Sequence, residues 1–197
     1  MSYKSPINPS TLTLKGVDAK IQVIQGQLDA GLSWLSKSFG LADRIVEERG
    51  GKPYIYPATF ESNTKDPIPL MPSDAWDSFC FWIKDGDTKF DEKTNPMDPL
   101  MTCPVSCIFY IDIHKISTGS YKETKSKLIE DIIHLFNNVK LGGMLVPTKF
   151  IEDDITEVYK GFTLDQLDNK FKMYPKWTCR MNFDLSYRND CYVLNTY

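Results

Sequence analysis

The sequence predicts an α+β fold, with a mixed, mainly antiparallel sheet, two long amphipathic helices and long loop insertions. The first observation is the run from Trp177 to Tyr187, in which apolar and polar residues alternate throughout, as in a long strand with one buried face. The second is a strand-like run from Val105 to His114 that leads into a capped helix with an apolar stripe. The third is the order of the elements, with one helix early and one late among the strands, which is typical of α+β proteins.

Length and composition favour a single folded domain. A chain of 197 residues can bury one proper core, and contents of 42% hydrophobic and 13% aromatic residues exclude a disordered chain. We expect residues 1–17 to form an N-terminal arm and residues 18–197 a single domain, with loop insertions near 85–104 and 146–176. The net charge of -3 argues against tight binding to a phosphate backbone, which needs clustered Lys and Arg. No run is apolar enough to span a membrane, and the first residues lack an export signal core.

The first predicted element is a helix from Ala19 to Phe39, capped by Asp18. Its apolar residues recur at intervals of three and four: Ile21, Ile24, Leu28, Leu32, Leu35 and Phe39. Gly26 and Gly31 each weaken a helix by about 1 kcal/mol relative to alanine, which indicates close packing against another element.

A hairpin and a central strand come next in the prediction. Residues 43–48 and 52–58 flank the turn pair Gly50-Gly51. Residues 77–84 are almost all apolar, which indicates either a central strand covered on both faces or one face of a subunit contact. Residues 85–104 are rich in proline and charge, and we expect a long loop there.

In the strand from Val105 to His114, alternation directs Cys107 to the core face and Asp112 to a polar face. The following helix is expected from Ser120 to Val139, since Ser120 and Glu123 have the spacing of a capping box. The alternating strand Trp177–Tyr187 pairs most naturally with this first strand, and we expect both long helices to pack on the resulting sheet.

The segment between these elements is less regular. Residues 149–159 fit neither the helical nor the strand period well, and a strand is the expectation there. Thr163 and Gln166 repeat the capping-box spacing, which predicts a short helix toward Phe171.

No residues can be assigned to catalysis, to a cofactor or to a metal ion from the sequence. The two histidines, His114 and His134, are expected on the surface. Cys107 and His114 would lie over about 20 Å apart on opposite faces of one strand, which excludes a nucleophile and base pair. The spacing of Cys103, Cys107 and His114 does not match a zinc site. The acidic clusters at 85–92 and 152–154 lack the calcium-loop pattern and are interpreted as solvated charge.

The five cysteines are expected to be free thiols in a reducing compartment, mostly buried in strands. They are Cys80, Cys103, Cys107, Cys179 and Cys191.

The order of elements resembles that of the tail terminator and tail-completion proteins of tailed bacteriophages. The resemblance lies in the opening helix 19–39, the apolar strand 78–84, the strand and helix 105–139 and the terminal strand 177–187, which together cover most of the chain. The aromatic-rich composition, with its Asn and Lys residues, also resembles proteins of phages of intestinal Bacteroidetes.

This resemblance implies a structural virion subunit rather than an enzyme. The chain would form a homo-oligomeric ring, of about six or twelve copies, at the head–tail junction, where DNA passes through without specific binding. Its partners would be other connector, portal or tail proteins, with no membrane and no cofactor. It would be assembled in the host cytoplasm and found in the virion.

In such a ring, contacts would come from the N-terminal arm, the hairpin 44–58 or the loop 85–104. The aromatic residues expected at the subunit interface are Phe79, Phe81, Trp82, Tyr54, Tyr56 and Phe90. An alternative function is that of a small α+β enzyme or ligand-binding domain, with a pocket under the long loops around Asp112, His114 or Asp184. A third is an adaptor domain with one partner and no ring.

Overall fold

The computed structural model describes residues 16–60, 66–91, 99–138, 144–165 and 167–188. Two sheets form the α+β fold, as predicted. The large, six-stranded sheet has the order β1-β5-β7-β9-β8, with β6 added beside β7, and the small sheet has the order β2-β3-β4. The strands are β1 (Lys37–Leu41), β2 (Asp43–Arg49), β3 (Lys52–Phe60), β4 (Pro67–Pro69), β5 (Ser78–Lys84), β6 (Lys89–Phe90), β7 (Leu100–Asp112), β8 (Met144–Glu152) and β9 (Lys176–Arg188). All neighbouring strands are antiparallel except β1 and β5.

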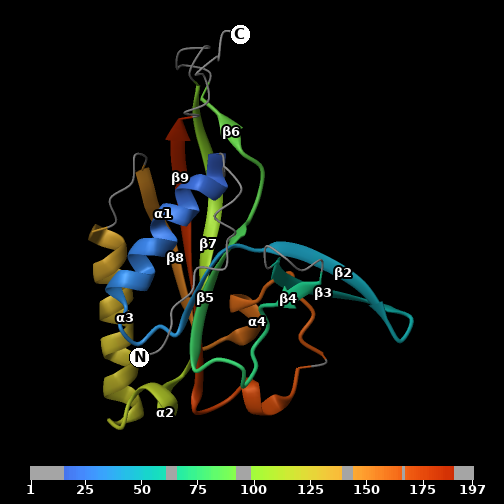
Figure 1. Cartoon of the computed structure of the whole chain (residues 1–197), viewed down its shortest axis with the longest axis vertical. Coiled ribbons are helices and arrows are strands. Elements are labelled where there is room, and N and C mark those ends of the chain that lie inside the picture. The colour runs from blue at the N-terminus through green and yellow to red at the C-terminus, as the bar shows by residue number, and fades with distance from the viewer. Residues whose placement is uncertain (1–15, 61–65, 92–98, 139–143, 166, 189–197) are drawn as a thin grey trace.

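The helices divide the structure into layers (Figure 1). The two long helices, α1 (Gly16–Gly31) and α3 (Tyr121–Asn138), cover one face of the large sheet, where they close the larger of two hydrophobic clusters. The small sheet and the short α4 (Ile155–Val158) cover the opposite face over a second cluster. Two further short elements are α2 (Ile113–Ile116) and the 3-10 helix η1 (Asn169–Phe171). No helix in these described ranges is long and apolar enough to cross a membrane.

The predicted pairing of the two long strands is confirmed. Leu100 to Asp112 of β7 pair with Arg188 to Lys176 of β9 without interruption, and both long helices pack on this sheet. The polar face of β7 is nevertheless buried and not solvated, because the small sheet and its neighbours cover it. Ser106 and Tyr110 are fully buried and Asp112 is 4% exposed.

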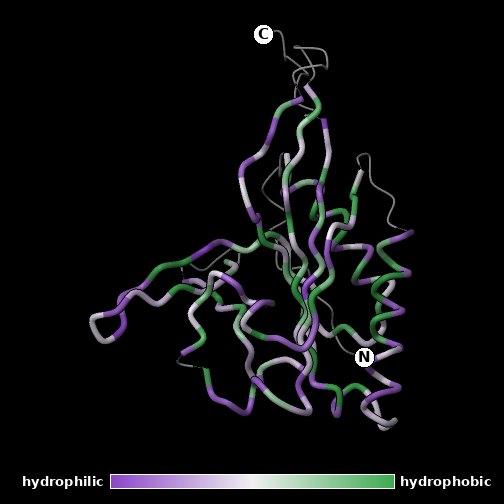
Figure 2. The backbone as a smooth tube through the Cα atoms, turned by 180° about the vertical axis from the view of Figure 1, so that it is seen from behind, coloured by the Kyte–Doolittle hydropathy of each residue, from purple (hydrophilic) through white to green (hydrophobic). Residues whose placement is uncertain are grey.

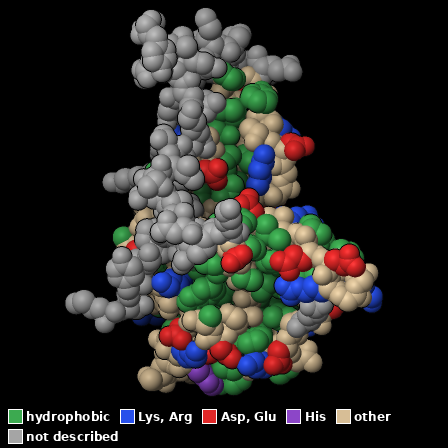
Figure 3. Space-filling model, turned by 45° about the vertical axis from the view of Figure 1, so that its right-hand side comes forward, with side chains coloured by type: hydrophobic (Ala, Val, Ile, Leu, Met, Phe, Trp, Pro, Cys, Tyr) green, Lys and Arg blue, Asp and Glu red, His purple; other side chains and the backbone are tan. Residues whose placement is uncertain are grey.

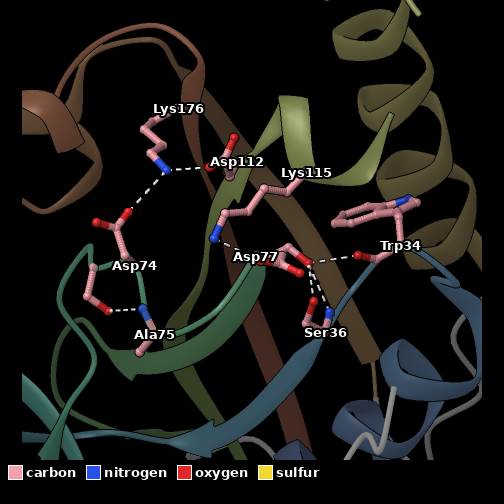
Figure 4. A network of polar contacts seen from close by, with 10 residues as sticks. Trp34, Ser36, Asp74, Ala75, Asp77, Asp112, Lys115 and Lys176 are labelled. Carbon is pink, nitrogen blue, oxygen red and sulfur yellow. Dashed lines mark hydrogen bonds and ion pairs between the residues drawn. The ribbon is translucent and has the colours of Figure 1, made fainter. Parts of the chain in front are cut away.

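The predicted helix 19–39 is wrong in its second half, and residues 16 and 17 belong to α1 and not to an arm. The helix ends at Gly31, and residues 37–41 form β1, which runs parallel to β5. The Ser78 hydroxyl holds the connecting chain, because it accepts from the Ser36 amide at 2.9 Å and donates to the Trp34 carbonyl at 2.7 Å (Figure 4). Phe39 continues the helical spacing by coincidence and packs in the second cluster, on the other side of the sheet.

The two expected insertions contain sheet structure. The first includes β6 and the start of β7 from Leu100, while residues 92–98 lie outside the described part. The second contains the edge strand β8. The strand expected over residues 149–159 is confirmed up to Glu152 but starts earlier, at Met144, and its second part is wrong because residues 155–158 form α4. Of the short helix expected from Thr163 toward Phe171, the described residues contain the 3-10 helix η1 (Asn169–Phe171). Thr163 itself does not cap a helix, because its amide and its hydroxyl bond to Ile55 of β3.

Candidate functional site

Five of the six aromatic residues predicted at a subunit interface lie in the core of the chain. Phe79, Phe81 and Trp82 are fully covered, and Tyr54 and Tyr56 are 8% and 1% exposed. The ring of Phe79 lies 5.4 Å from that of Tyr110, and the ring of Trp82 lies 5.9 Å from that of Phe136. A side chain buried by its own chain offers no surface to a neighbour, so of this set Phe90, 64% exposed, remains available.

The hairpin of β2 and β3, called the projecting hairpin below, extends away from the body of the molecule (Figures 1 and 2). Gly50 and Gly51 both have positive φ, 60° and 75°, which is the backbone of a two-residue hairpin turn that only glycine adopts without strain. β2 is the outer strand, and none of its seven residues is buried. Val46, at its centre, is 62% exposed, and the residues two positions away on the same face of the strand are Arg44 and Glu48.

The root of the projecting hairpin is fixed to the body. The Thr163 amide donates to the Ile55 carbonyl at 2.8 Å, and the Ile55 amide donates to the Thr163 hydroxyl at 3.0 Å. Arg44 donates to the Gly161 carbonyl at 2.8 Å. These contacts join the hairpin to a segment more than one hundred residues later, so the hairpin has a defined direction.

The outer half of the projecting hairpin is ordered by side chains of its own. Arg49 lies 3.9 Å above the ring of Tyr54 and forms an ion pair with Glu47 at 3.0 Å. The Tyr56 hydroxyl donates to Glu47, and burial together with this bond raises the pKa of Tyr56 to about 12. The same bond, with that of Arg49, lowers the pKa of Glu47. The hairpin therefore carries a fixed arrangement of charges.

A groove of about 570 Å³, the Arg180 groove, opens at the base of this hairpin. Its lining comes from the corner between β1 and β2, the end of β5, the segment after α4 and the middle of β9: Leu41, Ala42, Asp43, Arg44, Ile83, Lys84, Asp85, Lys160, Gly161, Phe162, Arg180 and Asn182. It lies where the cover of one face of the large sheet ends. β9 is buried on both faces from Trp177 to Met181, and from Asn182 onward its polar face opens to solvent while its apolar face stays buried.

A polar network forms the floor of the Arg180 groove. The buried Arg180 guanidinium contacts Asp85 at 2.5 Å, Asn182 at 3.0 Å and the Val158 carbonyl at 3.3 Å. The Ser106 hydroxyl bonds to Asp85 and lies 2.9 Å from Asn182. Because Asp85 balances Arg180, the positive charge that remains is on the exposed rim, where Arg44, Lys84 and Lys160 outnumber Asp43. Such a site has the chemistry to hold an anionic group.

The residues considered for acid, base or metal chemistry do not meet in one place. His114, on α2, contacts the Tyr174 hydroxyl at 2.6 Å, and His134 lies exposed on α3. Asp112 forms a buried ion pair with Lys176, which also reaches Asp74 (Figure 4). Asp184 is exposed on β9. Within the described ranges, no three His, Cys, Asp or Glu side chains are grouped so that they could hold a metal ion.

The acidic cluster 152–154 has a structural role. Glu152 and Asp153 both form ion pairs with Lys125 of α3, and Asp154 caps α4 by accepting from the Thr156 amide at 2.9 Å. Cys80, Cys107 and Cys179 are free and buried in strands, as predicted, and Cys103, from the segment expected to be a loop, is free and buried in β7. Cys191 lies outside the described residues. Burial raises the pKa of the Cys107 and Cys179 thiols well above the ordinary value.

Charged side chains of both signs lie close together along the lower rim of the face in Figure 3, with hydrophobic side chains between them and above. A surface with charges of both signs favours specific contacts. It does not produce the single-sign field that steers a charged partner from a distance. Comparison with known proteins finds no family model and no curated protein that matches the chain.

Proposed function

We propose that this chain is a structural virion subunit that assembles into a ring at the head–tail junction of a tailed phage. The observation that supports it best is the projecting hairpin, whose root is anchored and whose outer strand has no other strand paired along its outer edge in the described part of the chain. In this role the chain is not an enzyme, and its partners are further copies of itself and other connector, portal or tail proteins. The element order of the sequence, with its resemblance to tail terminators, supports the same role.

An exposed strand edge is a physical reason to expect a partner. Its unpaired N–H and C=O groups pair readily with another strand, so proteins normally cover such an edge, shorten it or charge it. An arm on one side of a subunit that contacts a different surface of the next makes a head-to-tail interface, which closes into a ring when the rotation is right. The net charge of -3 suits a channel that DNA crosses without being gripped.

Replacing Val46 with Lys tests the role of the hairpin. Val46 is 62% exposed, so the Val46→Lys chain is expected to fold normally, but a charge placed in an apolar contact is expected to weaken assembly about tenfold or more. Light scattering over a concentration series measures this. The matched control is Val23→Lys, at a 49% exposed valine on α1, which is expected to assemble like the native chain. Equal assembly of the two variants would contradict a contact through the hairpin.

The Arg180 groove favours a second candidate, a ligand-binding domain for a small anion. The groove is partly formed by the segment 160–162, which belongs to a long irregular connection, and its rim carries three cations. Inorganic phosphate or citrate would then raise the thermal midpoint of the native chain. The Lys84→Ala, Lys160→Ala double variant would lose this shift. An unchanged midpoint in the native chain would exclude this candidate for these anions.

A further inference from the structure

Two long strands of this chain have an open outer edge. β2 ends the small sheet and β8 ends the large one. Among the residues that the structure describes, no backbone hydrogen bond reaches the outer side of either strand. β8 is also exposed along most of its length, from Val146 to Lys149, with Phe150 and Ile151 half-buried. Each edge is a template for one more antiparallel strand.

We propose that β2 of one copy pairs antiparallel with β8 of the next copy, with Val46 opposite Phe150. This pairing rests on the proposed ring and specifies its contact, because it names the surface that receives the projecting hairpin. The register places Arg44 opposite Glu152, Ile45 opposite Ile151, and Glu47 opposite Lys149. Of these four pairs, Val46–Phe150 and Ile45–Ile151 are matched by apolar contact and Glu47–Lys149 by charge, which is the arrangement that stabilises antiparallel ladders. Arg44 and Glu152 also carry opposite charges, although within one chain Arg44 already donates to the Gly161 carbonyl and Glu152 already pairs with Lys125.

The faces of the two strands agree with this register. Phe150 packs partly against the core under the helices, and Ile151 packs partly against the core under the small sheet. Val46 and Ile45 of the incoming strand would therefore extend each core by one residue on its own side. The ladder of β8 is irregular between Pro147 and Lys149, and Pro147 has no N–H to donate, so the new pairing ends where the matched residues end.

A shift by one residue would lose the match. It would place Glu47 opposite Phe150 or Ile45 opposite Phe150 and would turn every side chain of β2 to the other face. A two-fold pairing of β2 with β2 of another copy, centred on Val46, pairs Asp43 with Arg49 twice and Arg44 with Glu48 twice. That arrangement also sets Ile45 opposite Glu47 twice and leaves β8 open, so the pairing with β8 is favoured.

Lys149 is positioned to form an ion pair with Glu47 of a neighbouring copy. It is exposed, and within the described residues it has no ion-pair partner. Glu47 is held by Arg49 and the Tyr56 hydroxyl, with its side chain 39% exposed, so its carboxylate is positioned before any contact forms. Reversing the charge in Lys149→Glu is expected to weaken assembly about tenfold. Combining it with Glu47→Lys is expected to restore assembly, which a purely structural role of either residue would not produce.

Disulfide trapping tests the register directly. In the full-length chain with Cys191→Ser, the variant Glu47→Cys, Lys149→Cys places two thiols opposite each other on neighbouring copies, since facing residues have Cβ atoms about 4.5–5.5 Å apart. Mild oxidation is expected to give a ladder of covalent oligomers on a non-reducing gel that collapses to monomer on reduction. The matched control is Glu48→Cys, Lys149→Cys, in which the thiols point to opposite faces and are expected to stay uncrosslinked.

The outcomes separate the two proposals. A native chain that assembles while Glu47→Cys, Lys149→Cys gives no ladder, and charge reversal has no effect, overturns the register and leaves the ring in place. Crosslinked dimers from Val46→Cys alone overturn it in favour of the two-fold pairing. A native chain that never assembles overturns the ring and this inference together.

Discussion

At the scale of single residues, the Arg180 groove depends on one ion pair. Arg180 is buried, and its charge is balanced by Asp85 at 2.5 Å. Asp85→Ala would leave a buried guanidinium without its counter-charge, and we expect the free energy of unfolding to fall by about 2–4 kcal/mol. Urea denaturation measures this. The matched control is Asp87→Ala, an exposed acid two positions later, for which a change within about 0.5 kcal/mol is expected.

A loss of less than about 1 kcal/mol in Asp85→Ala would contradict this account of the groove floor, because water would then be satisfying Arg180. A loss of similar size in both variants would point to the loop and not to the ion pair.

Residue-level patterns predicted burial better than they predicted its cause. Cys80, Cys107 and Cys179 follow strand alternation into the core, as expected. Asp112 was assigned to a polar face, yet it lies buried under the second layer, where Lys176, far away in sequence, balances its charge (Figure 4). No local signal marks such a partner, since a polar face covered by a second layer has the same alternation as a solvated one.

At the scale of elements, the two glycines of α1 differ. A side chain added at Gly26 would meet nothing within 4 Å, whereas one added at Gly31 would overlap a methyl group of Leu135 on α3. We expect Gly26→Ala to raise the free energy of unfolding by about 0.5–1 kcal/mol through helix propensity. Gly31→Ala is expected to give a smaller gain or a loss, because the Leu135 side chain must move out of the way. Thermal or urea unfolding of the two variants checks this, and equal gains would contradict the close approach at Gly31.

The strength of each pattern decided how well the elements were predicted. The hairpin with its Gly50-Gly51 turn and the strand β9 have unambiguous local chemistry, and both are confirmed. Residues 32–39 have a helical spacing, but Ser78, distant in sequence, bonds to Trp34 and Ser36 and holds the chain in a non-helical path just before β1. Thr163 has the spacing of a cap but bonds to Ile55. In both cases a tertiary hydrogen bond overrides a weak local preference.

At the scale of the whole molecule, the α+β class and the sheet under both long helices followed from the sequence, whereas the second sheet's position did not. That position matters for function, because it sends the projecting hairpin outward and leaves a groove at its base. The same holds for the six aromatic residues predicted at a subunit interface, five of which are buried within their own chain. Sequence marks large aromatic residues as buried, but only the three-dimensional arrangement separates burial by the chain itself from burial by a neighbour.

The central claim, that copies of this chain close into a ring through head-to-tail contacts, is tested most directly by the mass and shape of the purified full-length protein. Light scattering combined with electron microscopy over a concentration series is the measurement. A ring is expected to give a defined multiple of the subunit mass and annular particles with a central opening. A particle that stays monomeric at high concentration, with no annular form, would contradict it.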